Sequence, residues 1–172
     1  MPDATLDPLS QVYDALWELL EADEAWCALV PVGNRIKFAG KGVSPRKDQQ
    51  LSPADRPEVQ IRATSVVPYL NFDSSNTKVS AQFEIQIATG EQGFDASLFP
   101  VLWETIRALH RYQSHLNALT WRDVPFVKRT QAKSGAIGVG QGDANRGMLW
   151  WRVLWACEID MYFPATMMLP GS

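Results

Sequence analysis

Three carboxylates on predicted strands are the side chains of this sequence that could do chemistry together. Glu158 and Asp160 project from the same side of a strand near the end of the chain, and Glu84 belongs to a second strand that could lie beside it. Such a group could bind a cation or supply an acid and a base. The same carboxylates could form a solvated strand face paired with Arg62 or Arg152, and this second interpretation is favoured.

The other residues with chemical potential do not have the spacing of a known site. His110 and His115 are five residues apart, which does not place both rings on one helical face as ligands of one metal ion. The segment GAIGVGQGDANRG, residues 135–147, could cradle a phosphate, but it lacks a GK[ST] ending and precedes a strand, whereas nucleotide motifs open a helix. No nucleophile–base pair, metal cluster or nucleotide motif stands out in the sequence.

The strand that carries two of these carboxylates, MLWWRVLWACEIDMYF at residues 148–163, is strongly patterned. Its residues of one parity are all apolar, which predicts a long half-buried strand: Leu149, Trp151, Val153, Trp155, Cys157, Ile159, Met161 and Phe163. The opposite face mixes charges with large apolar groups at Trp150, Leu154 and Tyr162. These groups could be covered locally, or they could contact another chain.

Two further strands precede it. Residues 58–67 and 79–88 alternate apolar with polar side chains, and the turn-forming segment between them predicts an antiparallel hairpin. A short strand, broken at Pro125, is expected within residues 119–130.

Two amphipathic helices are expected, one over residues 8–22 and one from about residue 97 to His110. In each, apolar residues recur at spacings of three and four, which defines one buried stripe. The first stripe is Leu9, Val12, Tyr13, Leu16, Leu19 and Leu20, and the second is Leu98, Leu102, Trp103, Ile106 and Leu109.

Glycine, proline and polar residues predict long flexible loops at about residues 39–57 and 128–147. The resulting prediction is a single α+β domain over residues 1–172. It contains an antiparallel sheet of about four to five strands with two helices packed on one face.

Composition is typical of a globular chain, with 46% hydrophobic and 20% charged residues and a net charge of −3. No secretory signal and no apolar run of membrane-spanning length is present, so no membrane partner is expected. Charge is uneven, because residues 1–34 hold seven acidic residues and no Lys or Arg, whereas residues 35–56 are basic. Opposite charges on one domain could steer copies of it toward each other or toward oppositely charged neighbours. They could also be two ordinary solvated surfaces, and this interpretation is slightly favoured.

The order of segments resembles that of tail terminator and tail completion (neck) proteins of long-tailed bacteriophages. The segments that carry the resemblance are LSQVYDALWELLEA, a basic loop, RPEVQI, VSAQFEIQIATG, LFPVLWETIRALH, a glycine-rich loop and RGMLWWRVLWACEIDMYF, over roughly residues 8–163. The resemblance implies a homohexameric ring at the head-proximal end of the tail, which stops growth of the tail tube and joins it to the head. It also implies a sheet-plus-helix fold without cofactor or catalytic residues.

The implied partners are other copies of the chain, the tail tube protein and the head-neck connector proteins, with passing contact to genomic DNA. The implied location is the virion, assembled in the host cytoplasm. A small head–tail connector, a cellular adaptor protein and a ligand-binding α+β domain remain as alternatives.

The resemblance also suggests roles for three groups of residues. The candidates for subunit contacts are Trp150, Arg152, Leu154 and Tyr162. The candidates for a surface that faces the lumen or a partner are Lys128, Arg129, Lys133 and Arg146, since backbone phosphates require only accessible positive charge. The candidates for a docking loop are Lys41, Arg46 and Lys47.

Overall fold

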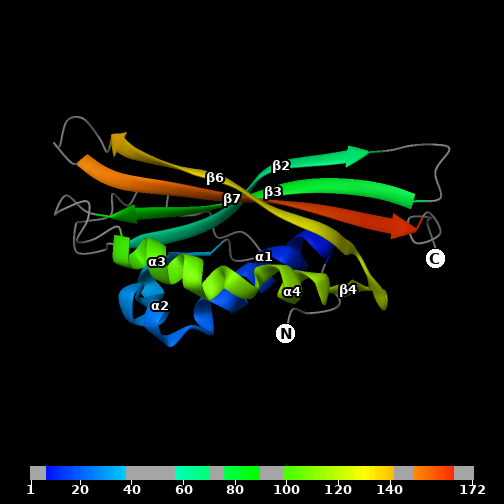
Figure 1. The fold of residues 1–172 in the computed structure, drawn as a ribbon, viewed down its shortest axis with the longest axis horizontal. Helices are drawn as coiled ribbons and strands as arrows, with labels where there is room; N and C mark the ends of the chain where they lie inside the picture. Colours follow the sequence, from blue (N-terminus) through cyan, green and yellow to red (C-terminus); the bar gives the residue numbers. More distant parts are fainter. Residues whose placement is uncertain (1–6, 38–56, 70–75, 90–98, 142–148, 165–172) are drawn as a thin grey trace.

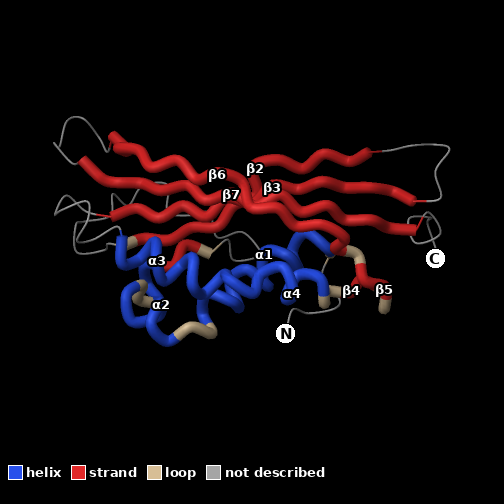
Figure 2. The backbone as a smooth tube through the Cα atoms, in the orientation of Figure 1, coloured by secondary structure: helices blue, strands red, loops and turns tan. Residues whose placement is uncertain are grey.

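The computed structural model describes residues 7–37, 57–69, 76–89, 99–141 and 149–164. Its main feature is a five-stranded sheet in the order β1-β2-β3-β7-β6, with the helices gathered on one face (Figures 1 and 2). The strands are β1 Arg35–Ile36, β2 Glu58–Tyr69, β3 Asn76–Thr89, β6 Val127–Gln141 and β7 Leu149–Pro164. The predicted α+β class with helices on one face of the sheet is confirmed.

The helical layer contains more helices than predicted. Its α-helices are α1 Pro8–Glu21, α2 Glu24–Leu29, α3 Phe99–Ala108 and α4 Tyr112–Asn117, and its 3-10 turns are η1 Val32–Asn34 and η4 Leu109–Arg111. The predicted first helix corresponds closely to α1. The predicted second helix corresponds to α3 and η4, after which α4 extends the helical segment by another short helix. No helix of the described part combines the length and apolar character of a membrane span.

The sheet is antiparallel except at β1. The predicted hairpin is present, with Ile61 of β2 opposite Ile85 of β3. β7 pairs with the other side of β3, where Phe83 stands opposite Cys157, and β6 then pairs with β7. Only β1, a two-residue edge strand, is parallel to its neighbour. The core forms where the buried residues of β2, β3 and β7 meet the helices.

The prediction of a flexible loop at residues 128–147 is wrong for its larger part. Residues 127–141 form β6, which pairs along β7, with Gly138 opposite Arg152 and Gly140 opposite Trp150. Glycine weakens an isolated strand, but a long neighbouring strand supplies the backbone hydrogen bonds that composition alone does not reveal. The pairing shifts register between Lys133 and Ala136, around Gly135. The predicted loop at 39–57 lies, apart from Pro57, outside the described residues.

The predicted buried stripe of α3 is partly wrong. Trp103 is 64% exposed and Ile106 is 48% exposed, whereas Leu109 is buried as predicted. The helix buries Val101, Thr105 and Ala108 instead. Thr105 belongs inside because its hydroxyl accepts a 3.0 Å hydrogen bond from Trp26 Nε1 of α2. Because Thr105 is polar, the spacing of the apolar residues alone indicated the wrong buried side of the helix. Leu98 lies outside the described residues.

The sheet extends beyond its helical cover at the outer end of β2. Residues 63–69 are all exposed, in contrast to the buried Val59 and Ile61. A bulge between Ala63 and Ser65 reverses the side-chain alternation. Val67 therefore stands opposite Ser80 on the open face, which is the face away from the helices.

Candidate functional site

A cluster of charged residues from three strands lies on the open face around Asp160. This β7 carboxylate is 4% exposed. Ser80 Oγ of β3 donates to its Oδ1 over 2.8 Å, and Lys78 Nζ lies 3.3 Å from its Oδ2. Arg129 Nη1 of β6 is 3.9 Å from the same oxygen. Asp160 therefore joins β3, β7 and β6 through side chains as well as through the backbone.

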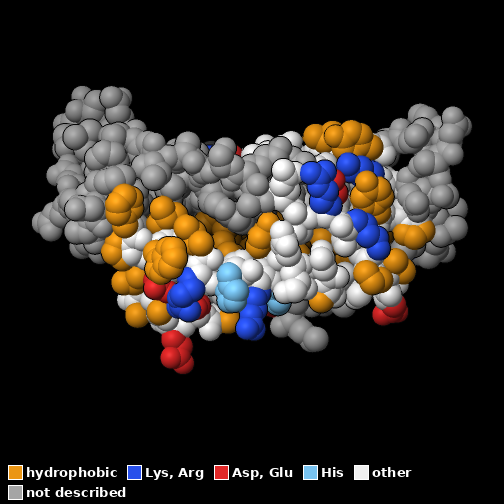
Figure 3. Space-filling view, viewed as in Figure 1, with side chains coloured by type: hydrophobic (Ala, Val, Ile, Leu, Met, Phe, Trp, Pro, Cys, Tyr) orange, Lys and Arg blue, Asp and Glu red, His pale blue; other side chains and the backbone are white. Residues whose placement is uncertain are grey.

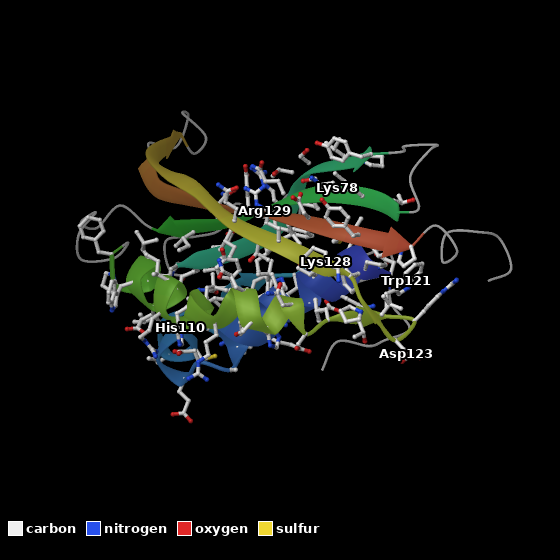
Figure 4. The ribbon with its side chains drawn as sticks, turned by 45° about the vertical axis from the view of Figure 1, so that its right-hand side comes forward. Lys78, His110, Trp121, Asp123, Lys128 and Arg129 are labelled. Atoms are coloured by element: carbon white, nitrogen blue, oxygen red, sulfur yellow. The ribbon has the colours of Figure 1, made fainter. Side chains whose placement is uncertain are left out.

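A pocket of about 610 Å³ opens beside this carboxylate. Three of its side chains are cationic and one is anionic, so the pocket is positively charged; we call it the basic pocket (Figure 4). It is lined by Lys78, Val124, Pro125, Lys128, Arg129, Asp160, Tyr162 and Pro164. The hydrogen bond to Asp160 raises the pKa of Lys78 above its ordinary value, so its ammonium group remains charged at neutral pH.

A short ribbon positions the start of β6 and hence two of these cations. The strands β4 Thr120–Trp121 and β5 Val124–Pro125 are joined by Arg122 and Asp123, both with positive φ, as in a two-residue hairpin turn. Phe126 then stacks on Phe163 of β7, and its carbonyl accepts a 2.9 Å hydrogen bond from the Tyr162 amide. This anchor places Lys128 and Arg129 at the pocket. The predicted short strand near Pro125 is thus a two-strand ribbon.

The paired-charge interpretation of the strand carboxylates is confirmed for Glu84, whose Oε2 lies 3.3 Å from Arg62 Nη2. Asp160 is also paired, but with Lys78 and Arg129, and it is buried rather than solvated. Sequence reasoning missed both partners because they depend on strand register. Glu158 stands opposite Gln82 and Gln131 in the sheet. Its side chain is outside the described part of the structure.

No group of His, Cys, Asp and Glu in the described residues has the arrangement of a metal site. The two histidines make separate contacts. His110 Nδ1 lies 2.6 Å from the Arg107 carbonyl oxygen, and His115 Nε2 lies 3.5 Å from Glu18 Oε2.

Among the proposed contact residues, the structure describes the side chains of three. Tyr162, Lys128 and Arg129 line the basic pocket. Trp150, Arg152 and Leu154 occupy β7, and Lys133 occupies β6, but their side chains are outside the described part of the structure. The remaining candidates, Lys41, Arg46, Lys47 and Arg146, lie outside the described residues altogether.

Five of the seven large hydrophobic residues exposed in the described part form two groups that sequence reasoning did not find. The α3 patch consists of Phe99, Trp103 and Ile106, at helical spacings that place them on one side of α3. The β2 patch consists of Val67 and Tyr69, which stand opposite Ser80 and Lys78 on the open face at the uncovered end of β2, whereas Val66 stands opposite Ala81 on the other face. In Figure 3, apolar side chains are visible over α3 and over the outer end of β2.

The chain was compared with known proteins. No protein-family model and no curated protein matches it. Among solved structures, one similar chain belongs to the virion of a native gene transfer agent (GTA) particle. The two are 15% identical, the match covers 87% of this chain and 93% of the other, and the TM-score is 0.49.

Proposed function

We propose that the chain is a structural component of a tailed-phage virion. In this proposal it forms a homohexameric ring at the head-proximal end of the tail, ends the tail tube and joins it to the neck. Its partners are other copies of itself, the tail tube protein and the connector proteins. The order of segments supports the proposal: an amphipathic helix, a long-stranded hairpin, a second helical segment and a final long strand occur in the order described for the resemblance.

The observation that carries the proposal is the length of the sheet relative to its helical cover. β2, β3, β6 and β7 contain 12, 14, 15 and 16 residues, respectively. These are long strands for a chain of this size, and residues 63–69 of β2 project without cover. An exposed apolar strand end is a liability for a monomer, but it is useful to a subunit that binds neighbours.

The decisive experiment combines solution mass with imaging. The purified protein is measured by light scattering, then incubated with tail tubes that lack their terminal ring, and the mixture is imaged by negative-stain electron microscopy. The expected result is a six-fold ring on one end of each tube. A protein that leaves the tube ends bare under all conditions contradicts the proposal.

The matched control is an unrelated acidic protein of similar mass. It should leave the same tubes uncapped, which excludes capping by net charge. Rings bound to portal complexes but never to tubes would instead support the head–tail connector alternative.

A further inference from the structure

We propose that copies of this chain associate head to tail, with the α3 patch of one copy packed against the β2 patch of the next. This inference rests on the proposed ring and names the surfaces that build it. The two patches are different surfaces on different elements, one on a helix and one on a strand end. They lie toward opposite ends of the long axis of the molecule (Figure 1).

The apolar content of both patches favours a protein partner. Trp103 is the most exposed aromatic residue of the two groups, at 64%, and Tyr69 is 51% exposed. Tryptophan and tyrosine are the residues that most often dominate binding energy at the centre of an interface. Three large apolar side chains on one side of α3 and two on the open face of the β2 end are more than scattered exposure on a monomer requires.

The charges beside the two patches have opposite signs. The β2 patch adjoins the basic pocket, because Lys78 Nζ lies 5.1 Å from the centroid of the Tyr69 ring. The α3 patch adjoins an acidic group at the junction of α2 and α3. There Arg107 bonds both Glu104 and Asp23, and the exposed Glu24 adds a further negative charge. An apolar centre with complementary charged borders is the usual composition of a specific interface.

The same charges select the partner. Two β2 patches facing each other would bring two basic pockets together, and two α3 patches would bring two acidic borders together. Both arrangements are disfavoured by repulsion between like charges. Only the pairing of unlike patches satisfies both ends, and a contact between unlike surfaces builds closed rings or open filaments rather than two-fold dimers.

The test uses two variants that each remove one patch. Trp103→Gln removes the centre of the α3 patch, and the double variant Val67→Gln, Tyr69→Gln removes the β2 patch. Val32→Gln is the matched control, because Val32 is 75% exposed and belongs to neither patch. Self-association is measured by sedimentation velocity over a range of concentrations. Circular dichroism checks that each variant is folded.

We expect wild type and Val32→Gln to associate equally, and each patch variant to associate at least about tenfold more weakly. An equimolar mixture of the two patch variants should form dimers and nothing larger, because each variant retains one intact patch. Dissociation of only one variant indicates a contact between like patches and overturns the inference. A wild-type protein that stays monomeric overturns it as well. Patch variants that keep full self-association and still cap tail tubes overturn this inference while leaving the proposed function intact.

Discussion

Ser80 and Asp160 stand directly opposite each other on the central strands β3 and β7, and Ser80 Oγ donates to Asp160 Oδ1 over 2.8 Å. The second carboxylate oxygen lies near Lys78 Nζ and Arg129 Nη1. Asp160 is thus the buried anion that pairs with two of the three cations of the basic pocket. A mutation can remove the charge of Asp160 and keep its hydrogen bond from Ser80.

Asp160→Asn should lower the free energy of unfolding by about 1–2 kcal/mol, because Asn can still accept from Ser80 but no longer compensates the nearby cations. Partial exposure of Lys78 and Arg129 keeps the loss moderate. Urea unfolding monitored by circular dichroism measures it. Glu84→Gln is the control, since it removes an ion pair with an exposed arginine and should change the same quantity by less than about 0.5 kcal/mol. Equal losses in both variants contradict a special role for Asp160.

The start of α1 provides a prediction that depends on pH. Asp7 caps the helix by accepting from the Ser10 amide over 3.0 Å and from its hydroxyl over 2.7 Å. Burial of Asp7 would raise the pKa of its carboxyl, but these hydrogen bonds outweigh burial and hold the pKa below its ordinary value of 3.8. The contribution of the charged cap is therefore complete above about pH 4 and is lost as the pH falls through the folded-state pKa.

Asp7→Ala should thus cost about 1 kcal/mol of unfolding free energy at neutral pH, and this difference from wild type should shrink in acid. Asp7→Asn is the control, because Asn caps a helix without a titrating group. Denaturant unfolding at pH 7 and below pH 3 measures both variants. A penalty for Asp7→Ala that is the same at both pH values contradicts the role of the charged cap.

Thr105→Val should lower the free energy of unfolding by about 1–3 kcal/mol, because it leaves the buried Trp26 Nε1 without its acceptor in a site of unchanged volume. Thr105→Ser keeps the hydroxyl and should recover most of the loss that belongs to the hydrogen bond. Thermal unfolding compares the two. If Ser is no better than Val, methyl packing rather than the hydrogen bond stabilises the α2–α3 contact.

Neutralising the basic pocket should weaken self-association. The double variant Lys128→Gln, Arg129→Gln should raise the dissociation constant roughly three- to tenfold, and its association should depend less on salt than that of wild type. Arg111→Gln, an exposed arginine on the helical side, is the control. Binding to a DNA duplex is measured in parallel. Unchanged self-association together with lost DNA binding would assign these two cations to nucleic acid rather than to a second copy.

The parts of the fold that follow local periodicity were predictable. Alternation located β2, β3 and β7, and the three-and-four spacing of apolar residues located α1. The Glu84–Arg62 pair was also predictable, since both side chains fall on the wet faces of hairpin strands.

Features that depend on contacts between segments far apart in the sequence were not predictable. β6 is glycine-rich and acquires its conformation from β7, and the partners of Asp160 depend on register. The buried side of α3 is shifted by about one residue from the expected one and includes Thr105, which accepts a hydrogen bond from Trp26. The basic pocket and the α3 patch follow from these three features, and the β2 patch follows from the bulge between Ala63 and Ser65.

The bulge between Ala63 and Ser65 divides β2 into two segments with different constraints. Substitutions before it change residues on which folding depends, such as Val59 and Ile61, whereas substitutions after it change only exposed positions. The outer segment is therefore free to diversify without loss of the domain. Residues 65–69 can be replaced as a unit while the buried residues of β2 stay unchanged.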